Sequence, residues 1–186
     1  MIPVTFSSPT SNTQRLFFAL WPELEIATRL HDLAGKPMHG DGRRVPPENI
    51  HLTLAFLGAV PASFRQCAER AATAIHGEPF SLILDQLGCW SKSGILWAGV
   101  EQAPEALLQL VQALNSGLTA CGYVPEKRPY TAHLTLARKV HRGVKNHPIE
   151  PLAWEVRRFC LVASRTHAQG AHYEILRAWE LAPPTA

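Results

Sequence analysis

The sequence lacks any apolar run that approaches the roughly 20 residues needed to span a bilayer. Residues 1–14 also lack the basic start and apolar core of a signal peptide, and they are rich in serine, threonine, proline and asparagine. We therefore expect residues 1–14 to form a flexible tail and residues 15–182 to form one folded domain. No membrane contact is expected, and the predicted location is the cytoplasm.

Cysteine is also scarce. The chain has four cysteines, which lie far apart and form no CxxC pair. This spacing supports neither a zinc site nor a disulfide framework. We expect reduced thiols, most of them buried in the core, at all four positions: Cys67, Cys89, Cys121 and Cys160.

Charged residues make up only 18% of the chain and apolar residues 46%, a composition that excludes a disordered protein. The formal net charge of +3 is mildly basic. It favours an anionic substrate but does not supply the strong positive field of a protein that coats duplex nucleic acid. The chain also lacks a glycine-rich nucleotide-binding loop, so we expect no need for ATP.

Apolar periodicity and the positions of proline and glycine divide the chain into strands and helices. Strands are expected at residues 15–21, 50–57, 80–87, 95–100, 133–137, 155–163 and 173–181, and helices at residues 23–33, 63–75 and 104–121. Residues 35–47 are rich in glycine, proline and arginine and are expected to form an exposed loop. This mixed order predicts an α+β fold rather than a regular doubly wound one.

One five-residue segment occurs twice, as HLTLA at residues 51–55 and again at residues 133–137. The copies are 82 residues apart, a little under half of the chain, and each follows a loop that contains proline and arginine. This spacing predicts two similar lobes, each contributing one such strand.

The repeated strand presents a histidine and a threonine on one face. Alternate residues of a strand share a face, so His51 and Thr53 project one way while the leucines between and after them project the other way. The same parity holds for His133 and Thr135. If the lobes pair about an approximate two-fold axis, two imidazoles and two hydroxyls face one pocket.

Two imidazoles suit phosphodiester hydrolysis near neutral pH, because one accepts a proton from water while the other donates one to the departing ribose oxygen. Each role is worth about 10² to 10⁴ in rate. The threonine hydroxyls are suited to donate to phosphate oxygens as charge develops, at roughly 3 kcal/mol each. A single such strand would more often be an ordinary edge strand whose histidine and threonine meet solvent, but its repetition favours a catalytic site. The arrangement requires no metal ion.

The repeated strand and its surroundings resemble the two-histidine phosphoesterases, and within them the RNA 2',3'-cyclic phosphodiesterases, once described as 2'-5' RNA ligases. The resemblance covers nearly the whole chain. It includes the opening RLFFALWP, residues 45–58, residues 130–138, and Ser164 and Arg165 followed by residues 173–181. It implies a bilobal α+β fold with antiparallel sheets around a central cleft and helices outside.

The resemblance also implies roles for single residues. By analogy, His51 is the general acid to the leaving 3' oxygen and His133 is the general base for water. Thr53, Thr135 and Arg138 are implied phosphate contacts.

The position of Arg138 conflicts with a regular strand. Arg138 lies five residues after His133, an odd step that puts it on the opposite face. A phosphate contact therefore requires the strand to end or to bulge near Ala137.

Three further residues are candidate RNA contacts. Phe56 follows the first repeated strand and either stacks on a base or is buried in the core. Arg43 and Arg44 precede His51, and they either hold neighbouring RNA phosphates or form a solvated charge pair.

The leading hypothesis is an enzyme that hydrolyses 2',3'-cyclic phosphate ends of RNA, and the resemblance further implies a 2'-phosphate product. The same acid and base would catalyse the reverse reaction, an ATP-independent 2'-5' ligation. A module that only binds RNA ends is a third possibility, against which the presence of both histidines and both threonines argues. We expect a monomer without a cofactor that acts on RNA ends or cyclic nucleotides.

Overall fold

The computed structural model of the chain describes residues 13–38, 41–141, 144–167 and 170–182. The strands are β1 (Gln14–Leu20), β2 (Arg43–Arg44), β3 (Leu52–Val60), β4 (Phe80–Trp90), β5 (Ile95–Gly99), β6 (His133–Arg138), β7 (His147–Val156), β8 (Arg158–His167) and β9 (Gly170–Glu180). The helices are α1 (Leu24–Met38), α2 (Ala62–Thr73) and α3 (Glu105–Thr119), with a short 3₁₀ helix, η1 (Pro47–Asn49). Most of the predicted tail, residues 1–12, lies outside the described residues.

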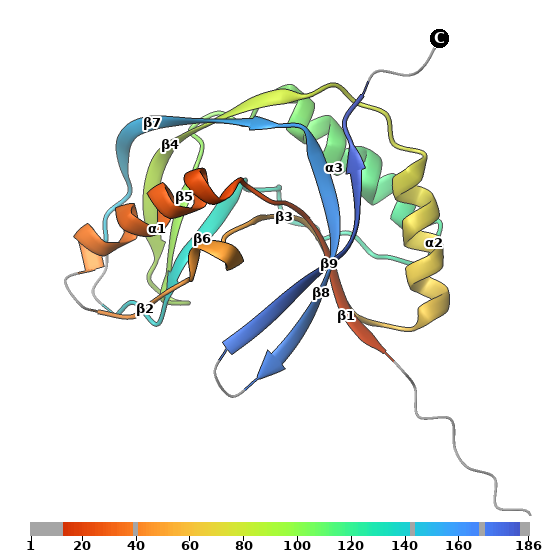
Figure 1. Cartoon of the computed structure of the whole chain (residues 1–186), viewed down its shortest axis with the longest axis horizontal. Helices are drawn as coiled ribbons and strands as arrows, with labels where there is room; N and C mark the ends of the chain where they lie inside the picture. The colour runs from red at the N-terminus through yellow and green to blue at the C-terminus, as the bar shows by residue number, and fades with distance from the viewer. Residues whose placement is uncertain (1–12, 39–40, 142–143, 168–169, 183–186) are drawn as a thin grey trace, which may run out of the picture.

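The strands form one antiparallel sheet in the order β7-β4-β5-β6-β3-β1-β8-β9, with β2 beside β6. Its two halves meet at β6 and β3, where the described pairing is limited to Leu52 and Leu134. Figure 1 shows α1 beside the half that holds β4, β5 and β6, and α2 and α3 beside the other half. The predicted α+β fold with antiparallel strands is confirmed, and in the described residues these strands form one open sheet.

Strand β1 is buried on both faces. Leu16, Phe18 and Leu20 point into the main hydrophobic core. Phe17 and Ala19 point the other way, into a smaller cluster that also contains Cys160, Val162, Trp21 and Tyr173. The sequence run 16–21 is apolar throughout because both faces of this central strand are covered.

The expectation of one strand at residues 155–163 is wrong. Two strands meet there, because β7 ends at Val156 and β8 begins at Arg158. Pro148 and Pro151 hid the first part of β7 from the sequence pattern. β7 pairs only with β4 and is an edge strand, the position in a sheet where proline is tolerated.

The expected loop at residues 35–47 is only partly correct. Helix α1 extends to Met38, four residues beyond Ala34, and Arg43 and Arg44 form the short strand β2. The pairing of β2 with β6 is long-range, so it left no signal in the local sequence.

The expectation of four reduced thiols is wrong for one pair. Cys67 of α2 and Cys121, just beyond the end of α3, form a disulfide with a Cα–Cα distance of 5.8 Å. The two cysteines are 54 residues apart and come together only because α2 and α3 pack against each other. Cys89 and Cys160 are free and buried, as expected.

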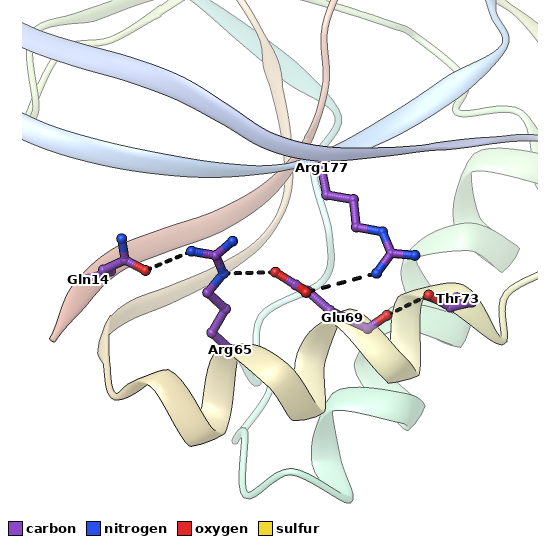
Figure 2. Close-up of polar contacts among 5 residues, drawn as sticks. All are labelled: Gln14, Arg65, Glu69, Thr73 and Arg177. Atoms are coloured by element: carbon purple, nitrogen blue, oxygen red, sulfur yellow. Dashed lines mark hydrogen bonds and ion pairs between the residues drawn. The ribbon is translucent and has the colours of Figure 1, made fainter. Parts of the chain in front are cut away.

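A polar network fastens α2 to the sheet (Figure 2). Arg65 forms a 2.8 Å ion pair with Glu69 and donates a 3.1 Å hydrogen bond to the side chain of Gln14 at the start of β1. Arg177 of β9 approaches the same glutamate at 3.9 Å. Glu69 therefore links α2 to β9, and Arg65 links α2 to β1.

Candidate functional site

The two copies of the repeated strand meet at the centre of the sheet. β3 and β6 are antiparallel, and Leu52 pairs with Leu134 where they touch. Each of these leucines is flanked by the histidine and the threonine of its repeat. The junction is therefore surrounded by the four predicted site residues: His51, Thr53, His133 and Thr135.

A β-bulge follows the threonine of each copy. The pairing of β3 with β1 skips Leu54, and the pairing of β6 with β5 skips Leu136 in the same place. An extra residue reverses the alternation of faces, so the residue five positions after each histidine returns to the histidine face. These residues are Phe56 and Arg138, both exposed, whereas the two residues before each are buried.

The bulge answers the two questions that the sequence left open. Arg138 shares a face with His133 because the strand bulges rather than continuing regularly. Phe56 is 45% exposed and is not a core residue.

Both site histidines make the same local hydrogen bond. Nδ1 of His51 lies 2.8 Å from the carbonyl oxygen of Asn49, and Nδ1 of His133 lies 2.9 Å from that of Thr131. A carbonyl oxygen only accepts, so Nδ1 carries the hydrogen in each ring. Nε2 is therefore the nitrogen available to exchange a proton with a ligand.

Three aromatic rings surround His51. The indole of Trp21 is stacked on the imidazole, with ring centroids 4.9 Å apart and planes 8° from parallel. Phe17 contacts the imidazole at 4.9 Å and a tilt of 32°. Tyr173 of β9 meets it edge to face at 5.0 Å.

His133 borders open space. Trp90 contacts its ring at 4.5 Å, nearly perpendicular at 72°. A cavity of about 550 Å³ lies beside it, with Thr53, Phe56 and Tyr130 also in its walls. This volume falls within the range of about 300–1,000 Å³ typical of small-ligand pockets. The Tyr130 hydroxyl donates a 2.9 Å hydrogen bond to the carbonyl of Thr53, which fixes one wall to β3.

Burial lowers the pKa of His51 to about 4, against the opposing effect of its hydrogen bond to Asn49. The positive charges of Arg138 and His133 lower the pKa of His51 further. Burial and Arg138 also lower the pKa of His133. Both imidazoles are therefore neutral near pH 7 in the ligand-free protein, and an anion bound between them would raise both pKa values.

Arg43 and Arg44 lie on β2, directly beside the second site strand. In the β2–β6 register Arg43 is opposite Arg138 and Arg44 is opposite Ala137. Both residues are exposed. They add positive charge to the rim next to Arg138, and their contact with RNA stays a prediction.

Sequence reasoning did not single out the aromatic residues around the histidines. Phe17 and Trp21 were part of an apolar run assigned to a strand, and Tyr173 was part of a closing strand. The alternation of faces along a strand could have indicated them. Phe17 and Trp21 share one face of the strand, whereas Leu16, Phe18 and Leu20 share the other.

Two classes of feature are not found in the described ranges. No three His, Cys, Asp or Glu side chains come together there in an arrangement suited to a metal ion. None of the helices in these ranges has both the length and the apolar character needed to cross a membrane.

Known proteins resemble this chain in sequence and in fold. The family model of the 2'-5' RNA ligase superfamily matches residues 22–168. An RNA 2',3'-cyclic phosphodiesterase of Escherichia coli (strain K12) is 36% identical over 174 residues, which cover 92% of this chain and 98% of that protein. The structure of E. coli LigT complexed with 3'-AMP has a TM-score of 0.83 at 34% identity, covering 91% of this chain and 99% of that one. The structure of TT0787 from Thermus thermophilus has a TM-score of 0.79 at 28% identity, covering 92% and 100%.

Proposed function

This chain belongs to the 2'-5' RNA ligase superfamily, and on that premise we propose that it is an RNA 2',3'-cyclic phosphodiesterase that leaves a 2'-phosphate. The observation that carries the proposal is the junction of β3 and β6, where two histidine–threonine pairs meet. In both imidazoles the backbone holds Nδ1, so Nε2 is available for proton transfer. The E. coli relative, which has the same activity in its name, matches over nearly the whole chain.

The proposed reaction divides the proton transfers between the two imidazoles. Nε2 of neutral His133 accepts a proton from water as the water oxygen bonds to phosphorus. The bond from phosphorus to the 3' oxygen breaks, and Nε2–H of protonated His51 donates its proton to that oxygen. The products are a 2'-phosphate and a free 3'-hydroxyl, and proton exchange with solvent restores both rings.

Phosphate binding is assigned to the two threonines and to Arg138. Thr53 and Thr135 flank the junction, which supports a role for their hydroxyls as donors to the non-bridging oxygens. The positive charge of Arg138 lowers the pKa values of both histidines, which supports a role for Arg138 in binding a phosphate between them. A guanidinium is suited to two parallel hydrogen bonds to phosphate oxygens.

His51 must gain a proton before it acts as the acid, because burial holds its pKa at about 4 in the free protein. The cyclic phosphate brings a negative charge to the junction and so favours the imidazolium. Substrate binding and protonation are therefore coupled in this proposal.

Phe56 is proposed to contact a base of the RNA. Its ring is in the wall of the cavity beside His133, and the guanidinium of Arg15 lies over the ring at 4.7 Å from the centroid. Arg43 and Arg44 are proposed to hold RNA phosphates beyond the reacting one, since they are exposed on the strand next to Arg138.

The remaining proposals concern the setting of the enzyme. We propose a monomer, since both lobes of the site come from one chain. We also propose that it acts in the cytoplasm on RNA ends, without ATP and without a metal ion.

The proposal is tested by turnover of adenosine 2',3'-cyclic phosphate in the presence of EDTA. His51→Ala and His133→Ala should each lower kcat by about 10² to 10⁴. The matched control is His147→Ala on β7, because Nδ1 of His147 makes the same hydrogen bond to a carbonyl two residues earlier, at 2.8 Å. Full activity of either site variant would contradict the proposal, as would loss of turnover in EDTA that zinc or magnesium restores.

A further inference from the structure

The residue that stands opposite the site histidine on the neighbouring strand differs between the two halves of the site. In the β1–β3 register Leu20 is opposite Leu52, so the next residue, Trp21, stands opposite His51. In the β5–β6 register Ala98 is opposite Leu134, and Gly99 stands opposite His133. Trp21 in one half of the site therefore has the position that a glycine has in the other half.

No side chain fits at the glycine. A Cβ atom on Gly99 would lie 2.8 Å from the carbonyl oxygen of Ala132 and 3.0 Å from the ring of Trp97. The carbonyl oxygen of Ala132 and the ring of Trp97 therefore leave no room for a side chain at Gly99, whereas Trp21 at the corresponding position stacks its indole on His51. The difference is built into the two strand pairs and is not a matter of side-chain rotamer.

The stacked geometry of Trp21 suits a protonated imidazole. Its ring is 8° from parallel to His51, with centroids 4.9 Å apart, so the π face meets the imidazole face. A cation over an indole face is stabilised by the ring quadrupole, and tryptophan is the strongest partner of this kind. Trp90, in contrast, meets His133 at 72°.

We propose that Trp21 is a positioning residue for His51, which holds the imidazole in place and stabilises its protonated form during the reaction. This inference rests on the proposed function, since it explains how the half-buried histidine serves as the acid. The acid is thereby distinguished from the base by the fold itself. His51 loses its proton to the 3' oxygen while stacked on Trp21, and His133 gains one beside the open cavity.

Other charged and titratable groups face His51 as well. Arg138 and His133 on β6 disfavour its protonation, and Tyr173 on β9 contacts the ring edge to face. Burial, to which the indole itself contributes, lowers the pKa of His51 most. In the proposal the π face of Trp21 opposes burial and the two charges on β6, and a bound phosphate adds to the effect of that π face. A change at position 21 should therefore alter the protonation of His51 and leave the charges on β6 in place.

The test compares Trp21→Leu, which keeps an apolar side chain without a π face, with Trp21→Phe, which keeps a π face. The pKa of His51 is followed by NMR of the histidine ring protons, with and without inorganic phosphate. We expect a lower pKa for His51 in Trp21→Leu than in the wild type, and a value close to wild type in Trp21→Phe. A raised pKa in Trp21→Leu would show that the indole acts only by excluding water and would overturn the proposal.

Kinetics supply the second measurement. Trp21→Leu should lower kcat on adenosine 2',3'-cyclic phosphate about 3- to 30-fold, the range expected for loss of a cation–π contact. It should retain near wild-type activity on a phosphodiester with a p-nitrophenolate leaving group, which needs no acid. Equal losses on both substrates, or equal losses in the leucine and phenylalanine variants, would overturn the proposal.

A matched control removes another stacked indole. Trp179 is stacked on Phe159 at 5.4 Å and 15°, away from both histidines, so Trp179→Leu should leave both kcat and the pKa of His51 unchanged. If the wild type does not open cyclic phosphates, the proposed function fails, but the NMR titration still tests the role of Trp21.

Discussion

The burial of His51 predicts a specific dependence of stability on pH. Its pKa is about 4 in the folded protein and 6.5 in an unfolded chain. Between these values the unfolded state binds more protons than the folded state, so the free energy of unfolding rises with pH. The contribution of His51 is present above about pH 6.5 and is lost as the pH falls toward 4.

The size of this effect follows from the two pKa values. Between pH 7.5 and pH 4.5 the linkage of a single group with this shift amounts to about 2.5 kcal/mol. This is a large fraction of the roughly 5–15 kcal/mol that stabilises an ordinary domain. The group is well suited to the measurement because the imidazole is largely covered by Trp21, Phe17 and Tyr173.

The contribution of His51 to the free energy of unfolding is measured by urea unfolding of the wild type and of His51→Asn at pH 7.5 and pH 4.5. The wild type should lose about 2.5 kcal/mol more than His51→Asn over this interval, since asparagine does not titrate. His147→Asn, at an exposed histidine with the same backbone hydrogen bond, should behave like the wild type. An identical loss in the wild type and in His51→Asn would show that burial does not lower the pKa of His51.

Three more predictions concern catalysis and stability. On a phosphodiester with a p-nitrophenolate leaving group, His51→Ala should lose far less activity than His133→Ala, because such a group departs without an acid; equal losses would reverse or remove the assignment. Arg138→Met should lower kcat/KM on cyclic phosphates about 10- to 100-fold, as expected for loss of a charged hydrogen bond, and an unchanged kcat/KM would exclude a phosphate contact. Cys67→Ser should lower the free energy of unfolding by about 4 kcal/mol, the chain-entropy value for a 54-residue separation. Reduction of the Cys67–Cys121 disulfide in the wild type should have the same effect, and a loss below about 1 kcal/mol in urea unfolding would contradict the expected value of about 4 kcal/mol.

The elements that could be predicted from the sequence are those whose pattern is local. Helix α3 was expected at residues 104–121 and spans Glu105–Thr119, because its leucines and Val111 recur at helical spacing and pack into the core. The junction of the site followed from the HLTLA repeat, since strand parity fixes which side chains share a face. The face on which Phe56 and Arg138 lie depends on the two β-bulges. A single sequence does not show where a bulge occurs, so this face could not be predicted.

The features that escaped prediction depend on which segments pair. Trp21 stands opposite His51 only through the register of β1 with β3, which a pattern of apolar residues does not specify. The Cys67–Cys121 disulfide depends in the same way on the packing of α2 against α3. In both cases the sequence contains the residues but does not show that they are in contact.

The product of adenosine 2',3'-cyclic phosphate is the most direct test of the central claim. Protein in EDTA is incubated with this substrate, and the product isomer is identified by ³¹P NMR. We expect adenosine 2'-phosphate as the product, because the acid at His51 releases the 3' oxygen. Adenosine 3'-phosphate as the main product, or no turnover by folded protein, would contradict it.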